Sequence, residues 1–419
     1  MQNKDISLFS PHDAPKLYDA FGTPEFDELY LEYENDTSVP RKTIGGQELF
    51  MSLLKERSET GRIYIMNIDH CNSHSSFKDK VNMSNLCQEI TLPTEPINHI
   101  DDPNGEIALC ILSAINVGKL RSLNEMPNLC DLAVRGLEEL IDYQEYPVAA
   151  ARRSTLARRS LGIGFIGLAH YFAKNGVKYN SQEAYNLTHR LTESFQYNLL
   201  RASNNIAKEK GACDAFHRTK YIDGILPIDT YKKEVDDLIT VSYEYDWDSL
   251  RDDIAEFGLR HSTLSAQMPS ESSSVVSNAT NGIEPPRDYL SIKKSKKGPL
   301  KQIVPQFTTY KNNYTLLWDM PSNEGYINVT AIMQKFFDQA ISGNWSYNPE
   351  NYPDNEVPVS VMANDLLTTY KLGWKTSYYQ NTYDNKKDVD AENTARTEQL
   401  INDILHGTES EEDCDSCKV

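Results

Sequence analysis

Apolar residues recur along the chain with two spacings, one typical of strands and one typical of helices. Four short segments are predicted to be strands or buried extended runs: 63–69 (RIYIMNI), 107–117 (IALCILSAINV), 263–268 (TLSAQM) and 376–381 (TSYYQN). Four longer segments carry apolar residues at helical spacing: 129–144, 181–211, 325–342 and 359–373. Ser181 is a suitable N-cap, and Gly211 a suitable stop, for the second of these helices. The alternation of strands and helices predicts an α/β architecture.

The pattern changes near residue 384, where the apolar periodicity fades. Residues 384–419 contain eleven acidic and four basic side chains. Such a composition cannot bury enough apolar surface to fold and is typical of a mobile terminus. We therefore expect one α/β domain over residues 1–383, followed by an acidic mobile tail over residues 384–419.

Composition narrows the class of protein. A chain of 419 residues with 39% hydrophobic side chains can bury a sizeable core, and no run approaches the roughly 18 apolar residues of a membrane helix. The first residues lack the pattern of a signal peptide, and seven irregularly spaced cysteines favour reduced thiols. A net charge of −19 argues against nucleic acid as a partner, because binding its backbone requires a basic face. We expect a cytoplasmic protein without membrane or nucleic-acid contacts.

Two conspicuous motifs favour structure over chemistry. The five lysines between residues 293 and 301 are interrupted by Gly298 and Pro299, which favours an exposed hairpin over a site for phosphate or a protein partner. The glycines at 162, 164 and 167 form a GxGxxG pattern, but the dinucleotide fingerprint requires a hydrophobic strand ahead of it. The preceding residues here are AAARRSTLARRS (149–160), so close packing of the backbone is the favoured use of these glycines.

The segment SNLCQEI (84–90) brings three chemical groups close together. In an extended segment, side chains two residues apart point the same way. The Asn85 amide, the Cys87 thiol and the Glu89 carboxylate would then share one face. Because most buried cysteines only fill space, this grouping indicates a reactive site only if other motifs support it.

Three such motifs are present, and each has a structural alternative. PSESSS (269–274) follows a predicted strand and is suited to open a helix whose N-terminus holds a phosphate, although an ordinary N-cap serine has the same pattern. Tyr378 and Tyr379 are adjacent, although twin tyrosines usually only pack. CDSC (414–417) is typical of a dithiol redox pair or half a metal site, and redox is favoured because His406 is the tail's one further ligand.

Together these motifs resemble one family, the catalytic large subunit of class I ribonucleotide reductase. The resemblance runs from SLFSPHDAPKLYDAFG near the start to CDSCKV at the end. It includes TGRIYIMNIDHCN, SNLCQEITLPT, GEIALC, LGIGFIG, MPSESSSVVSNATNGIEPPR and SYYQNT, in family order. It implies part of a ten-stranded α/β barrel in two five-stranded halves, with a radical cysteine on a loop inside. The implied activity is the reduction of ribonucleoside diphosphates to 2′-deoxyribonucleoside diphosphates for DNA precursor synthesis.

The resemblance assigns a role to each motif. The cysteine matching Cys87 becomes a thiyl radical and removes the 3′ hydrogen of the ribose. The glutamate matching Glu89 accepts the 3′-hydroxyl proton, and the asparagine matching Asn85 binds the sugar hydroxyls. Cys110, in GEIALC, matches one member of the thiol pair that supplies two reducing equivalents. The family's radical relay matches Tyr378 and Tyr379. Its tail dithiol, which reduces the active-site disulfide, matches Cys414 and Cys417. Its diphosphate-binding segment matches Pro269, Ser270, Glu271, Ser272 and Ser273.

The resemblance also implies partners. The oxidising equivalent comes from the tyrosyl radical and di-iron centre of a separate small subunit, and a thioredoxin- or glutaredoxin-like donor reduces the tail. In the family, a long section precedes the part that matches here. That section carries the second reducing thiol and the nucleotide effector sites, ATP binding among them. Because Cys71, Cys130 and Cys213 do not occupy the place of the second thiol, we expect a C-terminal portion that is inactive without a separate N-terminal fragment.

Two alternatives remain open at this point. One is a non-catalytic subunit that retains the fold and only binds partners. The other is a different thiyl-radical barrel enzyme, although no glycyl-radical motif is visible near the C-terminus. Cys71 and His74, in HCNSH, are the closest approach to a metal pair, but packing or a local hydrogen bond is favoured, and we expect no metal bound to this chain.

Overall fold

The computed structural model of the protein describes residues 4–295, 298–383, 399 and 401–404. The tail cysteines Cys414 and Cys417, together with His406, lie outside the described residues, as do Lys296 and Lys297 of the basic run. None of the helices in the described ranges is long and apolar enough to cross a membrane.

A parallel row of extended segments lies at the centre of the fold. Five segments lie side by side, in the order β4 (Ile111–Asn116), β5 (Leu161–Ile166), 263–268, 339–347 with β8 (Trp345–Tyr347), and 376–382 with β10 (Gln380–Thr382). Every residue of β5 is buried, as expected for a parallel strand covered on both faces. The described residues do not form a closed barrel.

Among the described residues, three further strand pairs are antiparallel; two lie outside this row, and one joins a strand to segment 376–382 of the row. They are β1 (Asp5–Phe9) with β2 (Arg41–Gly45), β3 (Ile65–Met66) with β9 (Thr376–Ser377), and β6 (Leu290–Ser295) with β7 (Gly298–Ile303). The third pair is the hairpin predicted around the basic run. The second pair attaches β3 to the segment that carries the twin tyrosines.

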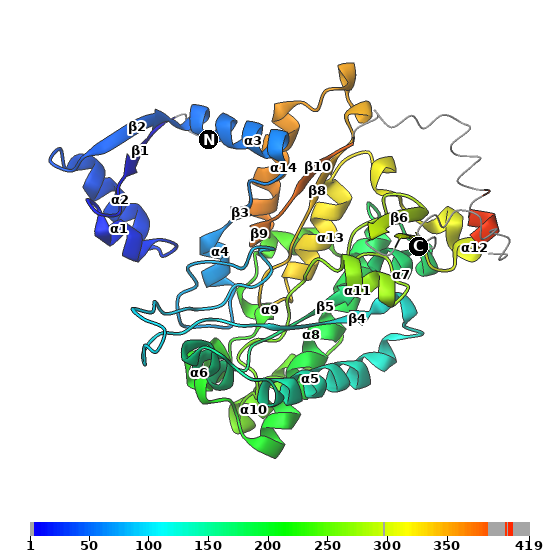
Figure 1. Cartoon of the computed structure of the whole chain (residues 1–419), viewed down its shortest axis with the longest axis horizontal. Helices are drawn as coiled ribbons and strands as arrows, with labels where there is room; N and C mark the ends of the chain where they lie inside the picture. The colour runs from blue at the N-terminus through cyan, green and yellow to red at the C-terminus, as the bar shows by residue number, and fades with distance from the viewer. Residues whose placement is uncertain (1–3, 296–297, 384–398, 400, 405–419) are drawn as a thin grey trace, which may run out of the picture.

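Helices cover the row and flank it (Figure 1). The α-helices are α1 (Pro15–Ala20), α2 (Glu25–Asn35), α3 (Gly46–Thr60), α4 (Ile68–Ser73), α5 (Met126–Tyr143), α6 (Ala149–Arg158), α7 (Leu168–Asn175), α8 (Gln182–Lys210), α9 (Pro227–Thr230), α10 (Trp247–Phe257), α11 (Glu271–Val276), α12 (Phe307–Tyr310), α13 (Glu324–Gln334) and α14 (Val359–Lys371).

The largest hydrophobic cluster forms around α8. This helix begins at Ser181, whose side chain accepts a hydrogen bond from Ala184 N–H at 3.1 Å, and it ends before Gly211. It packs against α5, α10 and α13, and its apolar side chains are buried along most of its length. Phe195 on α8 contacts Phe165 of β5, with ring centroids 4.5 Å apart, so the helix is fixed directly to the central row.

The N-terminal residues form an outlying lobe. Figure 1 shows β1, β2, α1 and α2 projecting from the body, joined to it through α3. None of the residues of α2 is buried. The lobe therefore contributes little to the main core.

Several predictions from the sequence are confirmed. The helices predicted over 129–144, 181–211 and 359–373 correspond to α5, α8 and α14, and the strand predicted over 107–117 contains β4. The GxGxxG glycines serve close packing, as predicted. A Cβ at Gly164 would lie 2.6 Å from the Ala266 carbonyl oxygen, and one at Gly167 would lie 2.7 Å from Asn116 Oδ1.

Two predictions are wrong in part. The strand predicted over 63–69 covers only Ile65–Met66, because α4 begins at Ile68. The helix predicted over 325–342 ends at Gln334, since the chain turns there to join the central row. In this turn the buried ammonium of Lys375 donates hydrogen bonds to the carbonyls of residues 337, 338 and 339.

Candidate active site

The segment SNLCQEI folds into a turn, which corrects the extended arrangement predicted from its spacing. The Asn85 carbonyl accepts a hydrogen bond from Gln88 N–H at 3.1 Å, and the Asn85 side-chain oxygen accepts one from Ile90 N–H at 3.1 Å. Gln88 has φ 66°, in the left-handed region that extended segments do not use. The side chains therefore do not alternate between two faces. Gln88 and Glu89 are both buried, while Leu86 is 76% exposed.

Residues 339–343 of the central row hold this turn, residues 85–90, which we call the Cys87 turn. Ser342 Oγ donates to the Cys87 carbonyl and lies 3.2 Å from Glu89 Oε2. Ala340 N–H donates to the Glu89 carbonyl at 3.0 Å. Glu89 is 2% exposed, and Cys87 is half-buried. A thiol and a buried carboxylate therefore share one short loop that is fixed to the row at both residues.

Cys110 lies immediately before β4 and contacts the same segment. Its Sγ accepts a hydrogen bond from Gln339 Nε2 at 3.7 Å. Burial raises the pKa of the Cys110 thiol, and the hydrogen bond from Gln339 opposes this only in part. The thiol is therefore protonated at neutral pH. Segment 339–343 thus brings together Cys87, Glu89 and Cys110, which the sequence separates by up to 23 residues.

Tyr378 and Tyr379 connect the Cys87 turn to the surface. The Tyr378 hydroxyl donates to Cys87 Sγ at 3.4 Å, and the two tyrosine rings are 4.1 Å apart between centroids. Tyr378 is 4% exposed, whereas Tyr379 is 36% exposed. Burial, with a contribution from the Cys87 contact, raises the pKa of Tyr378, and hydrogen bonds with Tyr378 and Tyr64 lower the pKa of Tyr379. The two tilted rings, with an interplanar angle of 49°, therefore form a contiguous aromatic path from solvent to the thiol.

A third tyrosine and a buried arginine belong to this cluster, and sequence analysis gave neither a role. The Tyr64 ring lies 4.7 Å from the Tyr378 ring and 5.4 Å from the Tyr379 ring. Arg57 on α3 donates to the Tyr378 carbonyl at 2.9 Å and lies over the Trp345 ring at 5.2 Å. Arg57 and Tyr378 are 321 residues apart in the sequence, so no local pattern could relate them.

The segment PSESSS opens a helix, as predicted. Ser270 precedes α11 and is buried, whereas Pro269, Glu271, Ser272 and Ser273 are exposed. The hydroxyl groups of Ser270 and Ser273 donate to backbone carbonyls near the start of the helix. The first N–H groups of a helix have no partner within it, so this exposed turn offers donors to solvent or to an anion.

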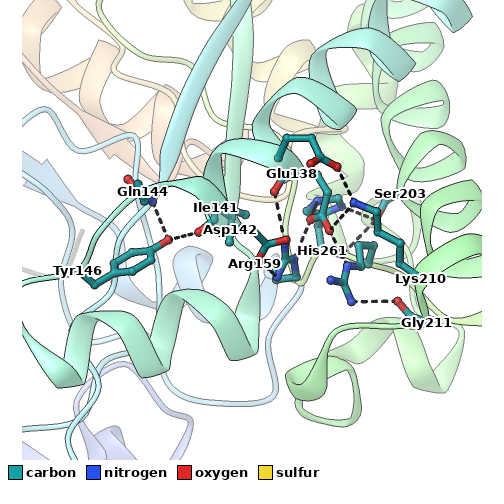
Figure 2. Close-up of polar contacts among 12 residues, drawn as sticks. Glu138, Ile141, Asp142, Gln144, Tyr146, Arg159, Ser203, Lys210, Gly211 and His261 are labelled. Atoms are coloured by element: carbon teal, nitrogen blue, oxygen red, sulfur yellow. Dashed lines mark hydrogen bonds and ion pairs between the residues drawn. The ribbon is translucent and has the colours of Figure 1, made fainter.

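A separate polar cluster resembles a hydrolytic triad in outline (Figure 2). Ser203 Oγ lies 2.9 Å from His261 Nδ1, and His261 Nε2 lies 3.1 Å from the Glu138 carboxylate. Arg159 and Arg260 donate to the same carboxylate. Ser203, His261 and Glu138 are fully or almost fully buried, so no substrate reaches the hydroxyl. The cluster is structural and joins α5, α8 and the segments that precede two strands of the central row.

The side chains of Cys71 and His74 in the HCNSH segment are buried and hydrogen-bonded, but their partners lie in distant segments rather than nearby in the chain, as a local hydrogen bond would require. Cys71 Sγ donates to the Lys375 carbonyl at 3.7 Å. The two ring nitrogens of His74 lie 2.8 Å from Thr230 Oγ1 and 2.7 Å from the Gln334 carbonyl. Within the part of the chain that the structure describes, no group of three or more His, Cys, Asp and Glu side chains could hold a metal ion.

Known proteins match the chain over most of its length. The family model for "Ribonucleotide reductase, barrel domain" matches residues 1–380. The ribonucleoside-diphosphate reductase subunit alpha of Haemophilus influenzae is 57% identical over 394 residues, which are 93% of this chain and 52% of that protein. The ribonucleoside-diphosphate reductase 1 subunit alpha of Escherichia coli is 53% identical over 394 residues, with coverage of 93% and 52%. The subunit alpha of phage T4 is 39% identical over 428 residues, which are 100% of this chain and 54% of that protein. The chain spans about half the length of these curated relatives.

Proposed function

This chain belongs to the ribonucleotide reductase barrel-domain family, and we propose that it is the catalytic part of a ribonucleoside-diphosphate reductase. In this proposal it converts ribonucleoside diphosphates to 2′-deoxyribonucleoside diphosphates through a thiyl radical. One observation carries the proposal. The two adjacent rings of Tyr379 and Tyr378 lead to a hydroxyl 3.4 Å from the sulfur of Cys87, in a turn that also holds the buried carboxylate of Glu89.

The first chemical step moves an oxidising equivalent inward. Tyr379 is exposed, so a partner can oxidise it, and its ring, 4.1 Å from that of Tyr378 between centroids, passes the equivalent to Tyr378. The oxidised Tyr378 then takes a hydrogen atom from the Cys87 thiol. The S–H bond breaks and the phenolic O–H bond forms. The Tyr378 hydroxyl already donates to this sulfur in the resting structure, so the transfer requires no rearrangement of the backbone.

Reduction of the ribose then uses the groups of the Cys87 turn. The thiyl radical removes the 3′ hydrogen, and Glu89 accepts the 3′-hydroxyl proton, which eases formation of the ketyl radical. The 2′-hydroxyl leaves as water after taking up a proton, and a thiol pair that includes Cys110 supplies two electrons and becomes a disulfide. The Cys87 thiol then returns its hydrogen atom to C3′, which regenerates the thiyl radical. The Asn85 side-chain oxygen accepts a hydrogen bond from Ile90 N–H. We therefore assign the side-chain NH₂ group of Asn85 to binding the sugar hydroxyls.

The diphosphate of the substrate is assigned to the exposed start of α11. Pro269, Ser270, Glu271, Ser272 and Ser273 match the family's diphosphate-binding segment. Backbone N–H groups at the start of a helix suit an anion, although the α11 helix is short. Ser270 is buried and is assigned to holding this turn rather than to contacting phosphate.

The remaining parts of the proposed reaction come from partners. A tyrosyl radical and di-iron centre in a separate small subunit would supply the oxidising equivalent. A thioredoxin- or glutaredoxin-like protein would reduce the tail dithiol of Cys414 and Cys417, which in turn reduces the site by thiol–disulfide exchange. A polypeptide corresponding to the rest of the relatives' length would supply the second thiol and the nucleotide effector sites. Because all of these thiols must be kept reduced, a cytoplasmic location is part of the proposal.

The test replaces Cys87 with serine in the enzyme assembled with its partners. A serine O–H bond is too strong to carry the radical efficiently, so formation of deoxyribonucleotide should fall to background while nucleotide binding and thermal stability are kept. Cys130→Ser is the matched control. Its thiol is buried on α5 and donates to the Phe195 carbonyl at 3.7 Å, so this variant should remain active. Substantial turnover by Cys87→Ser would refute the proposal. A wild-type assembly that binds its partners without turnover would identify a binding subunit.

A further inference from the structure

The sulfur of Cys110 faces a glycine on the neighbouring strand. Gly162 lies opposite Leu112 in the parallel β4–β5 pair. A Cβ at Gly162 would lie 2.7 Å from Cys110 Sγ and 2.7 Å from Leu112 Cδ2. Real Cβ atoms do not approach other atoms this closely, so any larger residue at this position must displace the thiol. The first glycine of the GxGxxG motif therefore creates the space that the sulfur occupies.

A buried amide contacts the same sulfur. Gln339 is fully buried, and its Nε2 donates to Cys110 Sγ at 3.7 Å and to the Leu161 carbonyl at 2.9 Å. Its Oε1 accepts from Thr91 N–H at 3.3 Å. Among the described residues, Gln339 is the sulfur's one side-chain hydrogen-bond donor.

The backbone of Gln339 is held as firmly as its side chain. Its N–H donates to the Ser265 carbonyl at 3.1 Å. Its carbonyl accepts from Gln334 Nε2 at 2.8 Å and from Lys375 Nζ at 2.9 Å. The amide therefore has a fixed position from which to orient the thiol.

We propose that Gly162 and Gln339 form a seat for the Cys110 thiol, in which the glycine fixes the position of the sulfur and the amide stabilises negative charge on it. The proposal rests on the proposed function, because it takes Cys110 as one half of the redox pair. Both residues act through Cys110 and are positioning residues for thiol–disulfide chemistry.

The charge on sulfur develops when the disulfide is reduced. The attacking thiolate of a dithiol reductant forms a bond to the sulfur of the second cysteine, and the bond between the two site sulfurs breaks. The electron pair leaves on Cys110 Sγ, which then takes a proton from solvent. A sulfur with a high thiol pKa is a poor leaving group, and a donor hydrogen bond to the departing thiolate offsets this disadvantage. A neutral amide does so without holding the resting thiol in its ionised form.

The first experiment measures the reactivity of the Cys110 thiol and requires no turnover. The reduced full chain is treated with methyl methanethiosulfonate between pH 7 and 9, conditions that we choose to expose the thiolate-dependent rate. Modification at Cys110 is followed by mass spectrometry of its peptide. Gln339→Met keeps a similar side-chain volume and removes the N–H donor. In this variant the Cys110 thiol should react about threefold to tenfold more slowly. Loss of the donor raises the pKa of the thiol, and the resulting fall in the thiolate fraction outweighs the rise in thiolate nucleophilicity. Gln339→Glu, which places a carboxylate beside the sulfur, should slow the reaction further.

Asn204→Leu is the control. Asn204 is also buried, but its Nδ2 donates to the carbonyls of Asp253 and Gly258 rather than to sulfur or to Gln339. Slowing in both Gln339 variants with an unchanged Asn204→Leu rate supports the seat. Equal slowing in Gln339→Met and Asn204→Leu, or no slowing in Gln339→Met, overturns it. The assay contains no nucleotide, so its failure is distinct from a failure of the proposed reductase activity.

The second experiment tests the glycine in the assembled, fully reduced enzyme. Gly162→Ala should lower the deoxyribonucleotide formed in a single turnover at least about tenfold while nucleotide binding is kept. Gly136→Ala on α5 is the control, because a Cβ there has no neighbouring atom within 4 Å, and full yield is expected from it. Full yield from a folded Gly162→Ala enzyme overturns the role of the glycine. If this variant does not fold, the Gln339 series decides the proposal.

Discussion

Replacing Tyr378 with phenylalanine separates a redox role from a packing role. Phenylalanine keeps the ring contacts with Tyr64 and Tyr379, at 4.7 and 4.1 Å between centroids, and loses only the hydroxyl that donates to Cys87 Sγ. A thiol is a weak acceptor, so the lost hydrogen bond is worth at most about 1 kcal/mol. For a chain of 419 residues, this lowers the midpoint of thermal unfolding by about 2 °C or less.

The effect on activity is expected to be of a different order. Phenylalanine cannot be oxidised at a potential comparable to that of tyrosine, so the path to Cys87 is interrupted at its last step. Formation of deoxyribonucleotide by Tyr378→Phe, in the enzyme assembled with its partners, should fall to background. Nucleotide binding should be unchanged, because the segment assigned to the diphosphate lies elsewhere in the chain.

Tyr179→Phe is the control for a tyrosine that only packs. Its hydroxyl is buried and donates to the Ile283 carbonyl at 2.7 Å. Removing it leaves a buried carbonyl without that donor, which costs about 1 to 3 kcal/mol of stability. This variant should unfold at a lower temperature and remain active. The reverse result for Tyr378→Phe, with substantial turnover and clearly lower stability, would refute the relay.

Two other predictions concern the buried cluster and the tail. Glu138→Gln removes the charge that Arg159, Arg260 and His261 surround, and chemical denaturation should show a loss of about 3 to 5 kcal/mol. Burial alone would raise the pKa of Glu138, but hydrogen bonds from these three residues hold it below its ordinary value, so the stabilisation is present above about pH 4.3 and is lost as the pH falls further. Identical acid-unfolding curves for wild type and Glu138→Gln would contradict this. Changing Cys414 and Cys417 together to serine should leave about one turnover with a protein reductant, and dithiothreitol should restore part of the multiple-turnover rate. Full multiple turnover with the protein reductant alone would exclude the proposed role of the tail.

Local sequence predicted those parts of the fold that depend on local interactions. Helix α8 begins and ends where Ser181 and Gly211 indicated, because capping depends on residues within one turn of the helix end. The extended arrangement of SNLCQEI was wrong, because the Asn85 side chain closes a turn onto Ile90 N–H and Gln88 adopts a left-handed conformation. Spacing of apolar and polar residues carries no information about such a side-chain closure.

The candidate site shows the same division. The motifs indicated Cys87, Glu89 and the tyrosine pair, because these residues are adjacent or nearly adjacent in the chain. No sequence motif indicated Ser342 or Gln339, since they contact Cys87 and Cys110 only because segments 229 or more residues apart pack together. Side-chain contacts at such separation follow from the tertiary fold and cannot be predicted from one stretch of sequence.

Segment 339–343 also constrains how the sequence of this protein can evolve. Ser342 bonds the Cys87 turn, Gln339 contacts Cys110, and the Gly343 carbonyl accepts from Tyr378 N–H at 2.8 Å. Residues that lie next to one another in a single hydrogen-bond network are energetically coupled, so the effects of substitutions among them do not add. A change that alters the position of one thiol will shift the geometry of the other and of the proposed relay, and only coordinated replacements will preserve all three. Mutational paths through these five positions are therefore strongly epistatic, and the order in which substitutions arise determines which sequences remain accessible.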